Sequence, residues 1–191
     1  MVRVGRTSAL LMPDVLRSIE ELERDRREHL SIGDQRAAAT CDREIGIALA
    51  EAGDLEGALV RLDAARSVLE RAGDIAICDH CLGIVLARLG REHEALQRLE
   101  SARSAYASQH RYLAVADCEE HIGYALLALD RPGAAVEHLS HARTLHDEAG
   151  RTDHVAACEA GLSAAGGHRP HPRPAFELPR VAPPLRARLS S

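Results

Sequence analysis

The sequence predicts an all-α protein, a solenoid built from a row of antiparallel helix pairs. Three observations support this fold class. Turn residues recur at intervals of twenty, as in Gly33-Asp34, Gly53-Asp54 and Gly73-Asp74. Between such marks the apolar residues recur every three or four positions, which is the helical period. Aromatic residues make up only 2% of the 191 residues, so Leu and Ala must form the core, and they favour helices over strands.

The first expected element is a capping helix over residues 13–33, preceded by a disordered segment at residues 1–12. One narrow stripe of this helix is apolar and consists of Leu16, Ile19, Leu22 and Leu30. Oppositely charged side chains four residues apart lie on its other side, where Glu20 and Glu23 precede Arg24 and Arg27. Such a helix can cover the end of a solenoid, whose terminal unit has a neighbour on one side only.

Residues 34–166 are expected to form three helix pairs and a final helix. The unit is close to 40 residues long, as the spacing of four cysteines indicates: Cys41, Cys78, Cys118 and Cys158. Small residues occupy matching places in the first and second helix of each unit, namely Gly46 and Ala58, Gly83 and Ala95, and Gly123 and Ala135. A glycine inside a helix costs about 1 kcal/mol relative to alanine. We therefore expect the paired backbones to approach closely at these glycines.

At these residues the chain resembles the tetratricopeptide repeat family, in the long form typical of actinobacterial regulators and CHAT proteins. The small residue of the first helix and two alanines of the second match the family pattern, with Gly46, Ala58 and Ala65 in the first unit. The resemblance implies a right-handed superhelix. The chain departs from the pattern where Leu49 replaces an aromatic residue and Glu70 replaces the usual proline.

Residues 167–191 are rich in Pro and Arg and are predicted to be a disordered tail, because proline interrupts helices and favours extended chain. The alternative is that the apolar residues of this tail dock on the helical array or on a partner. These residues are Phe176, Leu178, Val181 and Leu185.

The composition excludes several functions. The chain contains no lysine, which excludes Schiff-base catalysis by lysine and a phosphate-binding loop that ends in Gly-Lys-Ser/Thr. The net charge is −5, and the basic tail leaves an acidic body that is not suited to nucleic acid. No apolar stretch approaches the roughly 20 residues of a membrane span, so we expect no membrane association and a cytoplasmic protein with free thiols.

An acidic residue recurs in each expected first helix, 24 residues before an arginine in the second helix. The three pairs are Asp42 with Arg66, Asp79 with Arg103, and Glu119 with Arg143. In two antiparallel helices this separation places both side chains at the same level. We expect an ion pair within each unit that fixes helix register, and no acid–base catalysis.

The cysteines and histidines leave two interpretations open. Four side chains on adjacent first helices could form a tetrahedral zinc site, namely Cys78, Cys81, Cys118 and His121. The simpler interpretation is that cysteine acts as a small apolar residue in a repeated position. His138 and His141 lie on an outward-facing stripe of the expected second helix, and His146 lies off this stripe. We interpret all three as surface histidines. We expect no cofactor, metal ion or catalytic residue.

Stacked helix pairs form a concave surface lined by their first helices, and in the resembled family this groove binds a peptide. The positions that match the groove are Arg43, Ile47, His80, Ile84, Arg88, Asp117, Glu120, Tyr124 and Leu127. We therefore expect a non-enzymatic interaction module that binds a protein or peptide segment in a regulatory system. The alternatives are an accessory or sensor domain of a larger enzyme, such as a CHAT-type protease, and self-association of arrays.

Overall fold

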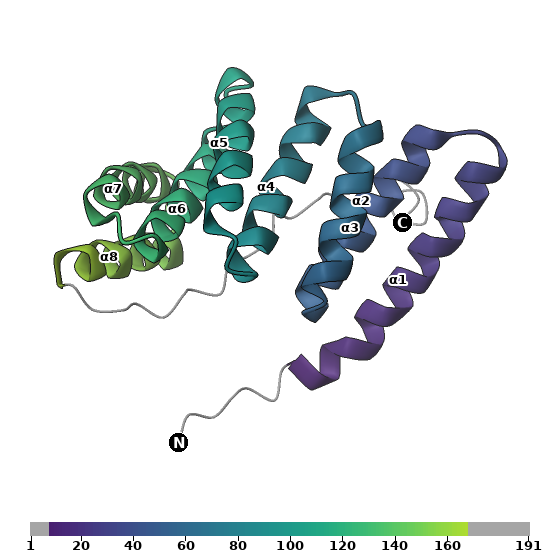
Figure 1. Cartoon of the computed structure of the whole chain (residues 1–191), viewed down its shortest axis with the longest axis horizontal. Coiled ribbons are helices and arrows are strands. Elements are labelled where there is room, and N and C mark those ends of the chain that lie inside the picture. Colours follow the sequence, from purple (N-terminus) through teal and green to yellow (C-terminus); the bar gives the residue numbers. More distant parts are fainter. Residues whose placement is uncertain (1–7, 168–191) are drawn as a thin grey trace.

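The fold is a single row of helices. The computed structural model describes residues 8–167 as helices and turns, with side chains from residue 18 onward. The helices of this part of the chain are α1 (Ser8–Ser31), α2 (Gln35–Ala52), α3 (Leu55–Val68), α4 (Ala72–Arg88), α5 (Glu92–Ser108), α6 (Tyr112–Ala128), α7 (Pro132–Glu148) and α8 (Thr152–Gly167). Each helix packs against the next, and the chain runs up and down along the row (Figure 1). The expected all-α solenoid is confirmed.

The structure describes most of the expected capping helix but almost none of the expected C-terminal tail. Helix α1 begins at Ser8, five residues before the expected start of the capping helix, and it packs against α2. The rest of the expected disordered N-terminus and nearly all of the expected tail, residues 168–191, lie outside the described residues. None of the described helices is long and apolar enough to cross a membrane.

Two of the three Gly-Asp marks, Gly33-Asp34 and Gly53-Asp54, lie at turns between helices, and four later turns contain Gly90, His110, Asp130 and Gly150. Gly33, Gly53, Gly90 and Gly150 have φ between 70° and 93°, and His110 and Asp130 share this left-handed conformation at φ 55°. The side chains of Asp34 and Asp54 accept hydrogen bonds from the N–H groups of Ala37 and Gly57, which caps the next helix.

The mark at Gly73-Asp74 is not a turn, and the expectation there is corrected. Both residues lie in the first turn of α4, which begins at Ala72. Helix α3 is only 14 residues long, shorter than the 17 residues of α5 and α7, and it ends before an extended Leu69. The shorter second helix explains why the first repeat step is 37 residues and the later steps are 40.

The expected close approach at the mid-helix glycines is confirmed. A Cβ atom built on Gly46, Gly83 or Gly123 would lie 2.5 to 2.7 Å from Cγ of the leucine that faces it in the paired helix. The facing residues are Leu62, Leu99 and Leu139, and all three are completely buried. Every helix pair is therefore joined by the same glycine–leucine contact.

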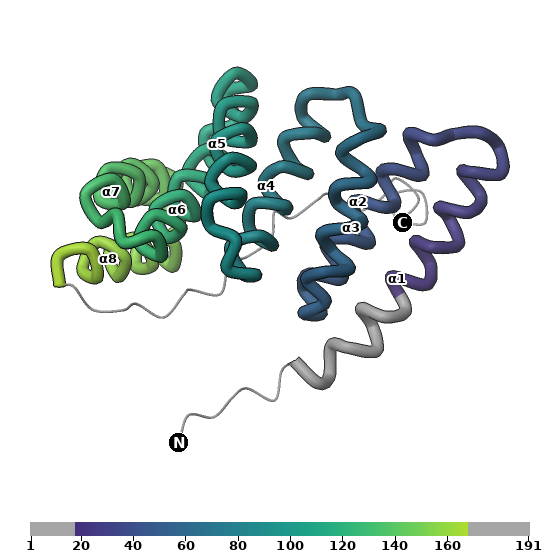
Figure 2. The backbone as a smooth tube through the Cα atoms, viewed as in Figure 1, coloured from purple at the N-terminus to yellow at the C-terminus, as the bar shows by residue number. Residues whose placement is uncertain are grey.

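The row curves because the first helices of successive units lie closer to one another than the second helices do. Each first helix contacts the first helix of the next unit: α2 contacts α4, α4 contacts α6, and α6 contacts α8. The second helices α3, α5 and α7 make no such contacts with one another. The first helices therefore form the inner layer of the curve. Figure 2 shows how α4, α5 and α6 follow one another along the row.

Candidate functional site

The nine residues expected to line a groove all lie on the inner-layer helices α2, α4 and α6, but few of their side chains are open to solvent. Six are buried, namely Arg43, Ile47, His80, Ile84, Glu120 and Tyr124. Asp117 and Leu127 are half-buried, and Arg88 is exposed. The burial arises where successive first helices contact each other.

The polar members of this set are bonded to the neighbouring first helix. Arg43 of α2 donates to Asp74 of α4 at 2.9 Å, and Arg88 of α4 donates back to the carbonyl oxygen of Ala50 at 2.8 Å. Burial alone would lower the pKa of Arg43, but its hydrogen bonds to Glu44 and Asp74 outweigh this and raise it. The junction between α2 and α4 is thus closed by charged pairs.

The junction between α6 and α8 is closed in the same way. Asp117 accepts a hydrogen bond from Arg151 at 2.5 Å, and the Tyr124 hydroxyl donates to the carbonyl oxygen of Ala157 at 2.5 Å. The inner face is therefore cross-linked by the chain itself. The binding of a peptide by the nine residues stays a prediction.

The prediction of an ion pair between these acids and arginines within each unit is wrong. Arg66 binds Asp79 at 2.5 Å, and Arg103 binds Glu119 at 3.0 Å, so each arginine pairs with the acid of the following unit. Arg26 of α1 pairs with Asp42 in the same manner at 2.8 Å. The second helix of one unit lies against the first helix of the next, and this contact brings the arginine within reach of the following acid.

Each acid also binds a partner in the second helix of its own unit. Asp42 accepts from Arg61 at 2.7 Å, Asp79 from Arg98 at 3.1 Å, and Glu119 from His138 at 2.5 Å. The carboxylate is thus held between two second helices. Burial would raise the pKa of Glu119, but its hydrogen bonds from His138 and Arg103 outweigh burial and lower the pKa to about 2.

The five cysteines are free and buried, as expected for thiols that fill a repeated position. Within the described residues, no group of three ligand atoms close enough to share a metal ion includes Cys78, Cys81, Cys118 or His121. The arrangement of four ligands considered from the sequence is therefore not formed. Burial raises the pKa of the Cys78 and Cys158 thiols to about 12.

His80 and His121 instead form a buried pair between α4 and α6. Nε2 of His80 lies 3.0 Å from Nδ1 of His121, and one nitrogen donates to the other. Burial lowers the pKa of His80 to about 4. Burial and the neighbouring charges of His80, His154 and His146 lower the pKa of His121 as well. Both rings are therefore neutral at pH 7.

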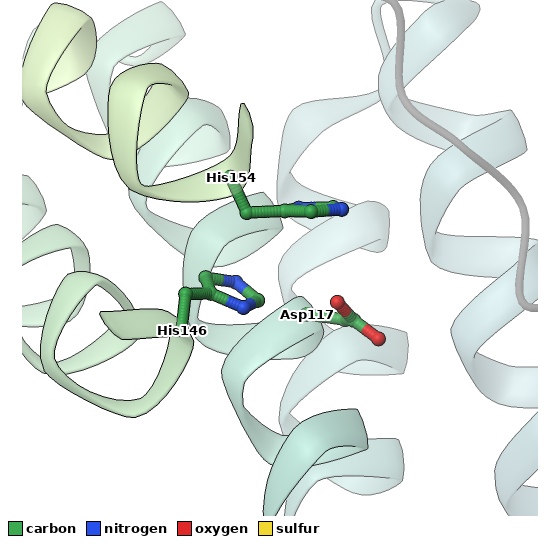
Figure 3. A group of neighbouring side chains, drawn as sticks. All are labelled: Asp117, His146 and His154. Carbon is green, nitrogen blue, oxygen red and sulfur yellow. The ribbon is translucent and has the colours of Figure 1, made fainter. Parts of the chain in front are cut away.

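A second group of polar side chains gathers where α6, α7 and α8 meet. Its members are Asp117 and Glu120 of α6, His146 of α7, and His154 and Cys158 of α8. The rings of His146 and His154 are neighbours, with centroids 4.6 Å apart and planes tilted by 30°, and Asp117 lies beside them (Figure 3). His146 and Cys158 are completely buried, and Glu120 is 6% exposed.

Glu120 is the centre of this group. Its Oε2 atom accepts a hydrogen bond from Nδ1 of His154 at 2.9 Å and lies 3.2 Å from Nε2 of His146. The contact with His146 lacks the alignment of a hydrogen bond, and neither ring nitrogen of His146 has a hydrogen-bond partner. A buried imidazole with two unpaired nitrogens costs free energy. The group thus contains ligand atoms that the protein itself does not satisfy.

His146, expected at the surface with His138 and His141, is completely buried. The repeat alignment contains a signal for its burial. His146 follows Ala142 by four residues, as Leu69 follows Ala65 and Tyr106 follows Ala102. Leu69 and Tyr106 are both buried, so this position faces the interior in every unit.

No protein-family model matches this chain, and no curated protein matches it at a significant level.

Proposed function

We propose that the chain is a non-enzymatic interaction module that binds a segment of another protein. The row of helices supports this proposal because each helix contacts only its near neighbours, which leaves a long exposed surface for its size. Extended surfaces of this kind are used for binding in other helical-repeat proteins. The binding surface that the geometry favours most is one edge of the row.

We choose this surface because five large apolar side chains are exposed there. They lie at the turns that lead from a second helix into the next first helix, and they are Leu30, Ile32, Val68, Tyr112 and Leu113. These turns join α1 to α2, α3 to α4 and α5 to α6, along the upper edge of the row in Figure 1. Ile32 is 72% exposed and Tyr112 is 59% exposed. Single exposed apolar side chains are common on protein surfaces, so it is their recurrence along one edge that supports this choice of surface.

Affinity capture with a matched pair of variants tests the proposal. The wild-type chain, a Tyr112→Ser/Leu113→Ser variant and a Val60→Ser variant are immobilised and exposed to an extract of the native host. Val60 is 68% exposed but lies in the middle of α3, away from the edge. Proteins that bind wild type and Val60→Ser but not the edge variant support the proposal.

Two results would count against it. Equal capture by all three proteins would place the binding surface elsewhere on the array. Failure of the wild-type chain to enrich any protein over a blank resin would remove the proposed function itself. Far-UV circular dichroism checks that both variants remain as helical as the wild type.

A further inference from the structure

The group at the meeting point of α6, α7 and α8 contains three buried atoms that can each bind a metal ion. These are Oε2 of Glu120, Nε2 of His146 and Sγ of Cys158, and the ligand atoms of the three residues lie within 4.8 Å of one another. Each comes from a different helix: α6, α7 and α8 respectively. Their side chains are almost entirely inaccessible to solvent.

His146 gives the independent sign that a ligand belongs here. It is completely buried, and both of its ring nitrogens lack hydrogen-bond partners. The same position holds Leu69 and Tyr106 in the other units, so the fold does not require a histidine at this place. A metal ion that binds this imidazole together with the neighbouring carboxylate and thiol would give one of the two ring nitrogens a partner.

The spacing of these atoms suits a small transition-metal ion. Bonds of about 2.0–2.3 Å at tetrahedral angles place ligand atoms about 3.3–3.6 Å apart. The separation of 3.2 Å between Oε2 of Glu120 and Nε2 of His146 is close to this range. A mixture of imidazole, thiolate and carboxylate is a ligand set that Zn²⁺ accepts, whereas Mg²⁺ and Ca²⁺ require oxygen.

His154 is better placed to orient a ligand than to be one. Its Nε2 atom lies 2.5 Å from Nη2 of Arg151, a group that can only donate, so Nε2 is an acceptor. Nδ1 therefore carries the proton and donates a hydrogen bond to Oε2 of Glu120. Carboxylates that bind metals are commonly held by hydrogen bonds of this kind.

We propose that this chain binds one zinc-like divalent metal ion through Glu120, His146 and Cys158, with water at the fourth position. On binding, a metal–sulfur bond replaces the S–H bond of Cys158, and the released proton passes to solvent. Asp117 and His154 are half-buried, so they are the most accessible members of the group. The bound ion ties α8, the last described helix, to the preceding pair.

Metal titration of the full chain tests the proposal. Apoprotein prepared with a chelator is dialysed against Zn²⁺, and the bound metal is measured by atomic emission. We expect one Zn²⁺ per chain and a melting temperature that rises with free Zn²⁺, because the ion binds the folded chain. Replacement by Co²⁺ should produce a thiolate-to-metal charge-transfer band.

Two variants remove a ligand without disturbing the fold. His146→Leu introduces the residue that occupies the same position in the first unit, and Cys158→Ser changes one atom. We expect each to weaken binding by at least about 100-fold, more than the loss of a group that merely supports a ligand. Cys158→Ser should also abolish the charge-transfer band. Circular dichroism verifies that both variants are folded.

Two controls separate this site from other histidines and thiols. Cys118→Ser alters the equivalent buried cysteine of α6, which belongs to neither ligand group, and should bind as wild type does. A His168→Ala/His171→Ala variant removes two histidines of the tail and should also bind normally. The proposal fails if wild type retains no Zn²⁺, or if His146→Leu binds as tightly as wild type.

Discussion

The first and last junctions of the array are built from the same four positions of the repeat, but different residue types occupy these positions. Each junction takes one residue from a first helix, one from the end of the paired second helix or directly after it, and two from the next first helix. At the α2–α3–α4 junction these residues are Arg43, Leu69, Asp74 and Cys78, and at the α6–α7–α8 junction they are Glu120, His146, His154 and Cys158. The salt bridge from Arg43 to Asp74 corresponds to the contact between Glu120 and His154.

This comparison separates what the backbone determines from what the side chains determine. The glycine–leucine contact is nearly the same in each helix pair, with distances of 2.5 to 2.7 Å from the built Cβ to leucine Cγ. The frame therefore presents similar positions at each junction. At the first junction these positions hold an ion pair and a leucine. At the last junction they include a histidine whose ring nitrogens have no hydrogen-bond partner.

The middle junction is intermediate between the two. His80 of α4 lies edge-to-face with Tyr106 of α5, with ring centroids 5.9 Å apart, and Cys118 is buried in the same apolar cluster as Tyr106. Ala114 takes the position that holds Asp74 or His154 in the other junctions. With alanine at that position, His80 bonds to His121.

The largest effect is expected from breaking the shared frame. Leu99→Ala removes a completely buried side chain that packs on Gly83, and it should lower the free energy of unfolding by about 2–5 kcal/mol. The equivalent changes Leu62→Ala and Leu139→Ala should cost similar amounts in urea titrations. A loss confined to one of the three would show that the helix pairs do not share a frame.

The next largest effect distinguishes the middle junction by its response to pH. Burial lowers the pKa of His80 to about 4 in the folded chain, from 6.5, with Asp117 opposing this shift and Arg111 adding to it. Below pH 6.5 the unfolded chain takes up a proton that the folded chain does not. Stability should therefore fall as pH decreases from about 6.5 to about 4, by on the order of 3 kcal/mol.

Urea titrations across this pH range test the histidine. His80→Leu should reduce the loss of stability, while the protonation of His121, whose pKa is also lowered, should preserve part of it. A pH dependence identical to that of wild type would show that His80 is not the group responsible.

A smaller effect, of opposite sign, is expected when the last junction is given the residue of the first. In the presence of a chelator, His146→Leu should raise the free energy of unfolding by about 1–3 kcal/mol, because it removes two unpaired buried nitrogens. The reciprocal change Leu69→His places an imidazole in the apolar cluster of Ala39, Ala65 and Cys78 and should destabilise the chain. A less stable His146→Leu apoprotein would show that the histidine is satisfied without metal.

The sequence predicts the frame better than the junctions. Glycines such as Gly53 and Gly90 identify turns because the left-handed backbone favours them locally. Gly73 misleads because the preceding helix is short, and only packing determines where that helix ends. The partner of Arg66 depends on how successive units are offset from each other. The residue spacing within one unit gives no information on this offset. His146 could be recognised only from its alignment with Leu69 and Tyr106.

The smallest effect tests the feature that the junctions share on their outer side, the ion pair between successive units. Arg66→Ala should cost about 1 kcal/mol, because Asp79 keeps Arg98 and Ser101 as donors and Arg66 is 36% exposed. A double-mutant cycle with Asp79→Asn should give a coupling energy of similar size. The same cycle with Asp42→Asn, the partner expected from spacing within the unit, should give a value near zero. The reverse result would place Arg66 within its own unit and would leave successive units without this link.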